Sequence, residues 1–367
     1  MRQSVRAMIG AMGLALAAAP AGAAEWFVQS GGDGDGSEQS PFGSIQDGLD
    51  AAEPGDVVTV RAGSYAESVA TVRDGAEDAP ITVRGEPGGE EVIVTAEGRV
   101  LRVDHAFIAV EALVIDGQYG TRDTVDVNDG ADHLVLREVE VRRSSRDCID
   151  MGAPADVLID SCVVHHCLDA TDGRTDAHGI TGGPVQRLTL RDTDVHTFSG
   201  DAVQFDPGRE PPGWDEIRIE GCRFWLEPLP AAANGFVAGA VPGENALDTK
   251  LDPAAPRARL TILDTAAWGF RGGMISNMAA FNLKENIDAV LDAVTVFDSE
   301  IAFRLRGPGS RGGAWVRVQN ALVYDVDVAA RYEDDIEQLD MYNVTLGLGV
   351  GRPFVAEEFA GPGAGPV

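Results

Sequence analysis

Two lysines are the residues of this chain whose spacing most clearly suggests a chemical role. The sequence holds 29 basic residues but only two lysines, Lys250 and Lys284, and each directly follows a short strand-like pattern. Asp206 and Arg306 follow similar patterns elsewhere in the chain. If these patterns occupy successive coils of one stacked parallel sheet, their side chains lie about 4.8 Å apart. Cations that close lower one another's pKa, and a lysine with a lowered pKa can act as a base.

These cations suggest a groove for an anionic sugar chain, and the family resemblance given below implies β-elimination on a uronate-containing polysaccharide, which is the leading hypothesis. That reaction needs a neutralised carboxylate, a base for the acidic C5 proton and loss of the glycosidic oxygen. Lys250 is the candidate base, and Lys284 is its catalytic partner. Substrate-binding residues are expected on the same outward face: Arg304, Arg306, Gln204 and Asn282. The alternative is a ladder of exposed ion pairs, which contribute about 0–1 kcal/mol each.

A second set of polar residues precedes the same strand patterns. It contains Asp147, His178, Asp201 and Asn245. If the register holds, His178 lies between two carboxylates, which would raise its pKa and make it a candidate proton carrier. The alternative is a turn histidine with a structural hydrogen bond. His165 and His196 also align, near His166, although their spacing matches no zinc motif.

The elements that must position these residues form a repeat. A phrase with apolar residues at its first, third, sixth and eighth positions recurs at 108–115, 134–141, 157–164, 188–195, 217–224, 260–267, 289–296, 316–323 and 339–346. Alternation within each half predicts strands, and the slip in the middle predicts a bend. Shorter strand phrases follow at 148–151, 179–181, 202–205, 246–249, 280–283, 302–305 and 329–332. Two or three short strands per repeat predict an all-β fold, a right-handed parallel β-helix whose coils bury a shared core.

Both ends of the chain differ from the coils. Arg2 and Arg6, an apolar run at 7–19 and small residues up to Ala24 predict a signal peptide over residues 1–24, and therefore a secreted or periplasmic protein. Residues 44–52 place apolar side chains on one helical face and predict a short N-terminal capping helix. The β-helix domain is expected over 25–350 and a flexible tail over 351–367. No stretch is long and apolar enough for a membrane span.

Residues 35–67, with the coils that follow to about residue 350, resemble the N-terminal entry and repeats of secreted β-helix proteins of the pectate lyase type. That group includes pectate lyases, alginate lyases and chondroitinase-like enzymes. The resemblance implies the fold and a polysaccharide partner, but one fold hosts many reactions. Glycoside hydrolysis on the same fold and non-catalytic glycan binding therefore stay open as alternatives.

The resemblance also implies a metal. Pectate lyases of family nine pair a lysine base with an aspartate-rich calcium site. In this chain the oxygen ligands that calcium prefers could come from Asp201, Asp206, Glu244 and Asp248. The tightly spaced aspartate cluster of that family is not present.

Two insertions stretch the coils, at 165–183 and 206–258, and long loops on a rigid scaffold often carry function. Trp214, Trp225 and Trp268 lie in or near the longer insertion and could stack on sugar rings, and Trp214 is the candidate substrate-binding residue among them. The alternative is ordinary packing. Four cysteines give two expectations: Cys162 and Cys222 are buried thiols in one interior column, and Cys148 and Cys167 could pair.

The overall charge limits the partners. With 59 acidic against 29 basic residues the formal net charge is −30, which excludes nucleic-acid binding through a basic surface. The same charge repels polyanions at long range unless salt screens it, so a salty habitat or a neutral glycan would fit better. We expect a monomer.

Overall fold

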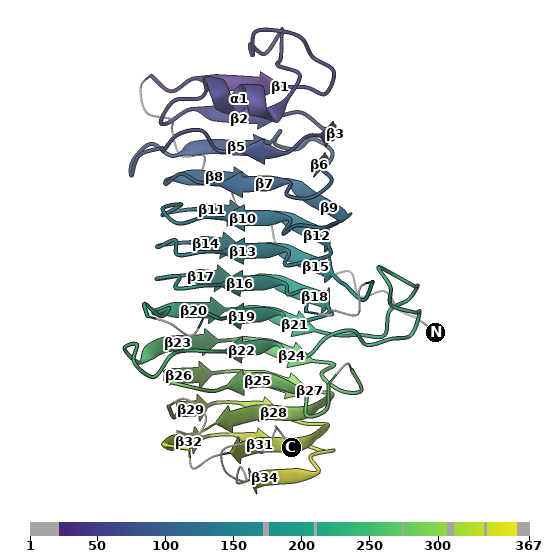
Figure 1. The fold of residues 1–367 in the computed structure, drawn as a ribbon, viewed down its shortest axis with the longest axis vertical. Coiled ribbons are helices and arrows are strands. Elements are labelled where there is room, and N and C mark those ends of the chain that lie inside the picture. Colours follow the sequence, from purple (N-terminus) through teal and green to yellow (C-terminus); the bar gives the residue numbers. More distant parts are fainter. Residues whose placement is uncertain are drawn as a thin grey trace.

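The computed structural model describes residues 22–171, 176–208, 211–273, 275–306, 312–333 and 336–357, and all statements below concern these residues. They form a parallel β-helix, in which the chain winds through coils stacked from the N-terminal to the C-terminal end (Figure 1). Each full coil contributes one strand to each of three parallel sheets, here called sheets I, II and III. The fold class predicted from the repeat is confirmed at this level.

Sheet I has 12 strands. They are β1 (Glu25–Val28), β2 (Val57–Val60), β5 (Ile81–Gly85), β8 (Ile108–Glu111), β11 (Val135–Arg137), β14 (Leu158–Asp160), β17 (Thr189–Arg191), β20 (Ile217–Glu220), β23 (Ala258–Leu263), β26 (Ile287–Asp292), β29 (Trp315–Gln319) and β32 (Gln338–Tyr342).

Sheet II has 11 strands. They are β3 (Gly63–Ala66), β6 (Val92–Thr95), β9 (Val114–Gly120), β12 (Glu140–Ser144), β15 (Val163–Cys167), β18 (Asp194–Phe198), β21 (Arg223–Trp225), β24 (Ala266–Trp268), β27 (Thr295–Phe297), β30 (Leu322–Val323) and β33 (Thr345–Leu346).

Sheet III also has 11 strands. They are β4 (Val69–Ala70), β7 (Leu101–Val103), β10 (Val125–Val127), β13 (Ile149–Met151), β16 (Ile180–Gly182), β19 (Val203–Phe205), β22 (Leu247–Thr249), β25 (Ala279–Leu283), β28 (Ser299–Arg306), β31 (Val326–Glu333) and β34 (Arg352–Glu357). The short strand phrases found in the sequence are the strands of this sheet, from β13 to β31.

The bend expected in the middle of the repeated phrase, in each of its nine copies, is the corner between sheets I and II. The fifth residue of every copy has a positive φ: Ala112, Glu138, Ser161, Asp192, Gly221, Asp264, Ala293, Asn320 and Asn343. A left-handed residue at this point turns the chain, so that the apolar residues on both sides of the corner still point inward. The irregular apolar spacing of the phrase therefore reflects one turned residue per coil.

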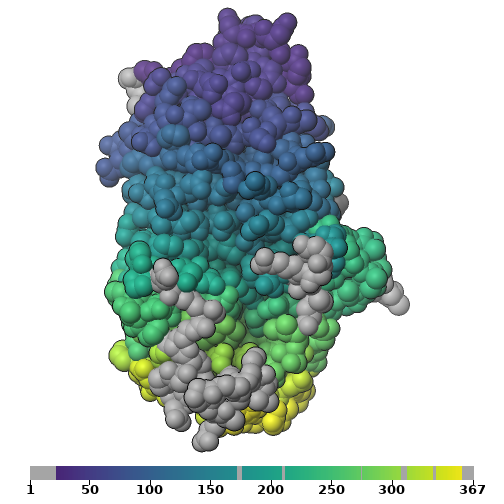
Figure 2. Space-filling model, viewed as in Figure 1, coloured from purple at the N-terminus to yellow at the C-terminus, as the bar shows by residue number. Residues whose placement is uncertain are grey.

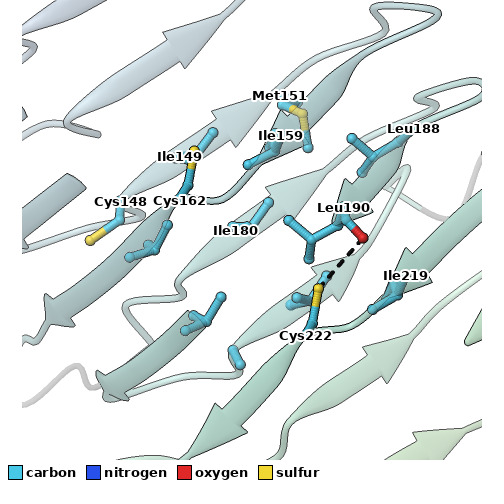
Figure 3. Packing of buried hydrophobic residues seen from close by; sticks show 14 of the residues in the cluster. Cys148, Ile149, Met151, Ile159, Cys162, Ile180, Leu188, Leu190, Ile219 and Cys222 are labelled. Carbon is cyan, nitrogen blue, oxygen red and sulfur yellow. Dashed lines mark hydrogen bonds between the residues drawn. The ribbon is translucent and has the colours of Figure 1, made fainter. Parts of the chain in front are cut away.

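Apolar side chains from all three sheets fill the interior. Figure 3 shows part of this core, where Cys162 and Cys222 lie among isoleucine and leucine side chains. Both are buried free thiols, as predicted, and Cys222 Sγ donates a hydrogen bond to the Leu190 carbonyl at 3.5 Å. Burial raises the pKa of the Cys162 thiol to about 11 and that of Cys222 to about 12. Cys148 and Cys167, whose pairing the sequence left open, form a disulfide.

A single short helix, α1 (Ile45–Ala51), lies beside β1 and β2 at the first coils of the described chain (Figure 1). The Ser44 side chain accepts a hydrogen bond from the Asp47 backbone N–H, which satisfies a free donor at the helix start. Ile45 and Leu49 are buried in the main core, as their spacing predicted. Residues 1–21 of the expected signal peptide lie outside the described residues.

At the other end, β34 pairs with β31 over Arg352–Glu357. The β-helix therefore extends beyond residue 350, and the expectation of a loose tail from residue 351 is wrong for these six residues. Residues 358–367 lie outside the described residues. None of the described helices is long and apolar enough to cross a membrane.

The longer insertion contributes a lobe between β21 and β22, which stands out from the side of the stack in green (Figure 2). Leu229 and Phe236 of the lobe pack with Leu168 of a preceding coil in a small apolar cluster. Asn234 donates a hydrogen bond to Ser145 Oγ at 2.8 Å. These contacts fix the lobe to the coils just after the sheet II strands β12 and β15.

Candidate functional site

The outward face of sheet III carries the polar residues that the sequence analysis singled out. The central outward residues pair in the order Asp150, Thr181, Gln204, Asp248, Asn282, Arg304 and Arg331. This is the register predicted from the sequence. Around its middle, six side chains form what we call the lysine–carboxylate cluster: Gln204, Asp206, Asp248, Lys250, Asn282 and Lys284.

Lys250 is held by oxygen atoms. Its Nζ lies 3.1 Å from Asp206 Oδ2, 3.1 Å from Gln204 Oε1 and 3.9 Å from Asp248 Oδ2. Burial disfavours the charged amine, but the carboxylates of Asp248 and Asp206 outweigh it, so the pKa of Lys250 is raised. The expectation of a lowered pKa is therefore wrong, because carboxylates rather than cations are the nearest charged neighbours. In this arrangement Lys250 is an ammonium group that orients oxygen atoms.

Asp248 links the two lysines. Its Oδ1 lies 2.9 Å from Lys284 Nζ and accepts a hydrogen bond from Asn282 Nδ2 at 2.8 Å. Asp248 is 4% exposed, and burial together with the Asp201 carboxylate raises its pKa, while Lys284 and Lys250 oppose this rise. The contact with Lys284 favours the charged pair. Gln204 links Lys250 to Asp201. Its Oε1 lies 3.1 Å from Lys250 Nζ, and its Nε2 donates a hydrogen bond to Asp201 Oδ2 at 2.8 Å.

The four residues expected to bind calcium are not arranged as a metal site. Asp201 Oδ1 accepts hydrogen bonds from the backbone and side-chain amides of Asn245, at 3.1 and 2.8 Å. Asp206 and Asp248 bind lysine ammonium groups, which occupy the positions where a cation would compete. Among the described residues, no group of three or more His, Cys, Asp or Glu side chains could hold a metal ion. These side chains therefore do not fit a calcium ion, and no step below uses one.

His178 belongs to a ladder of side chains that bind the next coil. Asp147 Oδ1 accepts from the His178 backbone N–H at 2.9 Å, and His178 Nδ1 accepts from the Asp201 N–H at 2.8 Å. Asp201 in turn accepts from Asn245 N–H, and Asn245 Oδ1 accepts from Ala279 N–H at 2.9 Å. The Nδ1 lone pair is used, so the neutral ring carries its proton on Nε2. His178 holds coils together, which does not support a role as a base.

Glu244 brings a carboxyl group with a raised pKa to the same face. It lies where the lobe returns to sheet III, and its backbone N–H donates to the Gly200 carbonyl at 2.8 Å. Burial, followed by the negative charges of Asp201, Asp176 and Asp248, raises the pKa of Glu244 to about 8. At neutral pH the side chain can therefore donate a proton, which is the property of a general acid. The sequence placed Glu244 in this region but predicted a metal ligand.

The arginines beyond the cluster are engaged by acidic side chains. Arg304 Nε lies 2.9 Å and Arg306 Nε 3.4 Å from the carboxylate of Glu333, which also binds Arg331 Nε at 2.8 Å. Glu333 is 2% exposed. If Arg304 and Arg306 bind substrate as expected, the substrate must compete with the Glu333 carboxylate for their guanidinium groups.

Trp214 is not available for a sugar ring. It is 1% exposed, packs against Phe205 with ring centroids 5.1 Å apart, and donates a hydrogen bond from Nε1 to the Lys250 carbonyl at 2.9 Å. Its expected role in sugar stacking is therefore wrong, because the loop folds back and covers the ring. Trp214 instead fixes the backbone of Lys250.

Trp225 and Trp268 belong to a stack of rings on the outward face of sheet II. Neighbouring ring centroids are 4.3–5.3 Å apart along His165, His196, Trp225, Trp268, Phe297 and Tyr324. The rings lie face to face, so they present edges to solvent and do not offer the open faces that stack on sugars. The sequence analysis missed this stack, although its members all stand one position after a copy of the repeated phrase.

Comparison with known proteins supports the fold and leaves the reaction open. No family model matches the chain, and no curated protein matches it in sequence. A rhamnogalacturonan lyase structure is similar with a TM-score of 0.65 and 13% identity, covering 82% of each chain. A Paenibacillus alginate lyase gives 0.52 and 14% identity over 82% of this chain and 96% of that one. A polygalacturonase from Erwinia carotovora gives 0.54 and 11% identity over 92% and 96%. The chain thus resembles the right-handed β-helix of the pectate lyase type, a fold on which both polysaccharide lyases and glycoside hydrolases occur.

Proposed function

We propose that this protein is a secreted or periplasmic enzyme that cleaves a polysaccharide by hydrolysis on the outward face of sheet III. The observation that carries the proposal is Glu244, a partly buried carboxyl group whose pKa is raised to about 8 by burial and by the negative charges of Asp201, Asp176 and Asp248. Glycoside hydrolysis uses such a pair of environments, one carboxyl group that donates a proton and one carboxylate that activates water or attacks.

In the proposed reaction Glu244 protonates the departing glycosidic oxygen. Asp206 is the candidate for the second carboxylate, because 32% of its side chain is exposed while Lys250 holds it at 3.1 Å. Lys250 and Lys284 hold Asp206 and Asp248 in place through ion pairs of 3.1 and 2.9 Å. Export is supported by the Cys148–Cys167 disulfide, since such bonds persist in oxidising compartments.

Elimination on a uronate is the second candidate. It is favoured by the positions of Lys250 and Lys284 on adjacent coils, both bound to Asp248. It requires Lys250 to lose its proton, which the surrounding carboxylates oppose. Hydrolysis does not require Lys250 to lose its proton.

The test is incubation with a panel of neutral and uronate-containing polysaccharides, followed by assays of reducing ends and of absorbance near 235 nm. Hydrolysis predicts reducing ends without absorbance. Glu244→Gln and Asp206→Asn should each lower the rate by about 10²–10⁴-fold, while the control Glu227→Gln, an exposed residue of the same lobe, should not. Unsaturated products that disappear in Lys250→Ala would establish elimination instead. Retention on a glycan without either product would identify a binding protein.

Salt dependence separates the substrate classes. The net charge of −30 repels anionic polymers at long range. Cleavage of an anionic polymer should therefore accelerate as salt screens the repulsion, whereas cleavage of a neutral glycan should change little.

A further inference from the structure

Three histidines gather on the outward face of sheet II, whereas the proposed active site lies on sheet III. His165 and His196 occupy the same register position on β15 and β18, and their rings stack with centroids 5.0 Å apart. His166 follows at the end of β15 with a φ of 57°. The left-handed conformation turns its side chain toward His165 rather than away from it. The two Nδ1 atoms of His165 and His166 lie 2.6 Å apart.

Glu140 determines which nitrogen of His165 carries the proton. Its Oε1 lies 3.1 Å from His165 Nε2. A carboxylate accepts hydrogen bonds, so Nε2 carries the proton in the neutral ring and the Nδ1 lone pair faces His166. A carboxylate behind a histidine in this way orients the ring and increases its basicity toward a metal.

We propose that His165 and His166 form a binding site for a divalent transition-metal cation such as Cu²⁺ or Zn²⁺. Two imidazole nitrogens are the ligands that these borderline ions prefer, whereas Ca²⁺ and Mg²⁺ prefer oxygen. Metal–nitrogen bonds of about 2.0–2.1 Å place neighbouring ligand nitrogens about 3 Å apart. The Nδ1 atoms need to separate by only a few tenths of an ångström, and water completes the coordination.

The surroundings allow a cation to bind. Arg142 and Arg143, the nearby cations, are bound to the Asp116 carboxylate at 2.8 and 2.6 Å, and Arg142 also pairs with Glu140 Oε1 at 2.7 Å. When the metal ion binds His166 Nδ1, the proton on that nitrogen moves to Nε2 of the same ring, so binding releases no net proton. His196 lies one coil away and is not a ligand of the same ion.

Asp169, in the loop that follows β15, is not part of the proposed site. Asp169 Oδ1 accepts hydrogen bonds from the Thr171 backbone and hydroxyl, at 2.9 and 2.7 Å, and is not directed at the histidines. Asp172 lies outside the described residues. The proposal therefore rests on the two imidazoles and on the orienting carboxylate of Glu140.

Titration of the chelator-treated full chain with Cu²⁺ and Zn²⁺ tests the proposal. Calorimetry should give one strong equivalent, and the Cu²⁺ electron paramagnetic resonance spectrum should show coupling to two nitrogens. His165→Ala and His166→Asn should weaken binding by at least about tenfold, and Glu140→Gln by about 10–100-fold. Asn is chosen at position 166 because it tolerates a positive φ.

His133→Ala is the matched control, since His133 is a half-exposed histidine on another corner of the coils that stacks on Phe107. The affinity of the His133→Ala variant for Cu²⁺ and Zn²⁺ should equal that of the unmodified protein. Absence of a strong equivalent in the unmodified chain would overturn the proposal, and so would unchanged affinity in the folded His165→Ala and His166→Asn variants. Circular dichroism confirms that each variant is folded before titration.

Discussion

Lys250 Nζ lies 3.1 Å from Asp206 Oδ2, the carboxylate that precedes it by one coil of sheet III. The lysine that was expected to be a base is thus the counter-ion of a carboxylate, and Lys284 has the same relation to Asp248 at 2.9 Å. The face that carries the candidate site combines lysine–carboxylate ion pairs with Glu244, a carboxyl group whose pKa is raised by burial. Such pairs of environments separate the roles of acid and base in hydrolysis.

Replacing Lys250 with methionine should destabilise the protein and abolish activity together. The substitution keeps the apolar stem but leaves Asp206 and Asp248 without a shared cation. The expected loss is on the order of 1–3 kcal/mol in the free energy of unfolding, measured by urea denaturation. Lys250→Arg, which keeps the charge, should recover most of the stability. Equal stability of the methionine variant would show that the ion pairs contribute nothing.

Replacing Trp214 with alanine should lower stability without changing sugar affinity directly. The ring is 1% exposed and packs on Phe205, so its removal leaves a cavity and should cost about 3–5 kcal/mol. Trp214→Phe, which fills most of the volume, should fold and bind glycan with the affinity of the unmodified chain. A large rise in Kd for the folded phenylalanine variant would instead support sugar stacking.

Removing the disulfide should loosen the coils that anchor the lobe. Cys148 and Cys167 have a sequence separation of 19, and a loop of about that size is associated with a stabilisation of about 3 kcal/mol. Cys148→Ser with Cys167→Ser should lower the midpoint of thermal unfolding, and hydrogen exchange should rise first in the lobe. Cys162→Ser serves as a control for burying a hydroxyl group without loss of a crosslink.

The corner between sheets I and II can be tested at Ala293, an exposed residue with a φ of 57°. A β-branched side chain is disfavoured in this conformation, so Ala293→Val should cost roughly 1–2 kcal/mol. Ala293→Gly relieves the same constraint and should not reduce stability. Because the position is exposed, loss of packing cannot explain a difference between the two variants in urea unfolding.

The fold could be predicted because each coil repeats the same requirement. Inward positions must be apolar on every coil, and the register of the polar column from Asp150 to Arg331 follows from aligning them. Even the corner residue leaves a signal, since it shifts the apolar spacing in the middle of the phrase. Local alternation and stacking are both visible in the sequence.

The chemistry of the site could not be predicted with the same success, because it depends on which neighbouring groups each side chain contacts in the folded protein. The alignment brought Lys250 and Asp206 together, but it did not weigh the carboxylates against the neighbouring cations. Trp214 was misjudged because its loop has no repeat from which to infer a path. The burial that raises the pKa of Glu244 depends on how the lobe packs, and no periodic pattern records that packing.

That burial makes Glu244 a source of pH-dependent stability. Its pKa is raised from 4.5 to about 8, so the folded state binds more protons than the unfolded state between these values. Stability due to this group is therefore complete below about pH 4.5 and is lost as the pH rises toward 8. Glu244→Gln lacks this loss, so it should be more stable than the unmodified chain at pH 8–9, on the order of 1–3 kcal/mol, and nearly equal to it at pH 4. Urea unfolding of both proteins across this range measures the difference, and a constant difference would mean that Glu244 ionises normally and is no general acid.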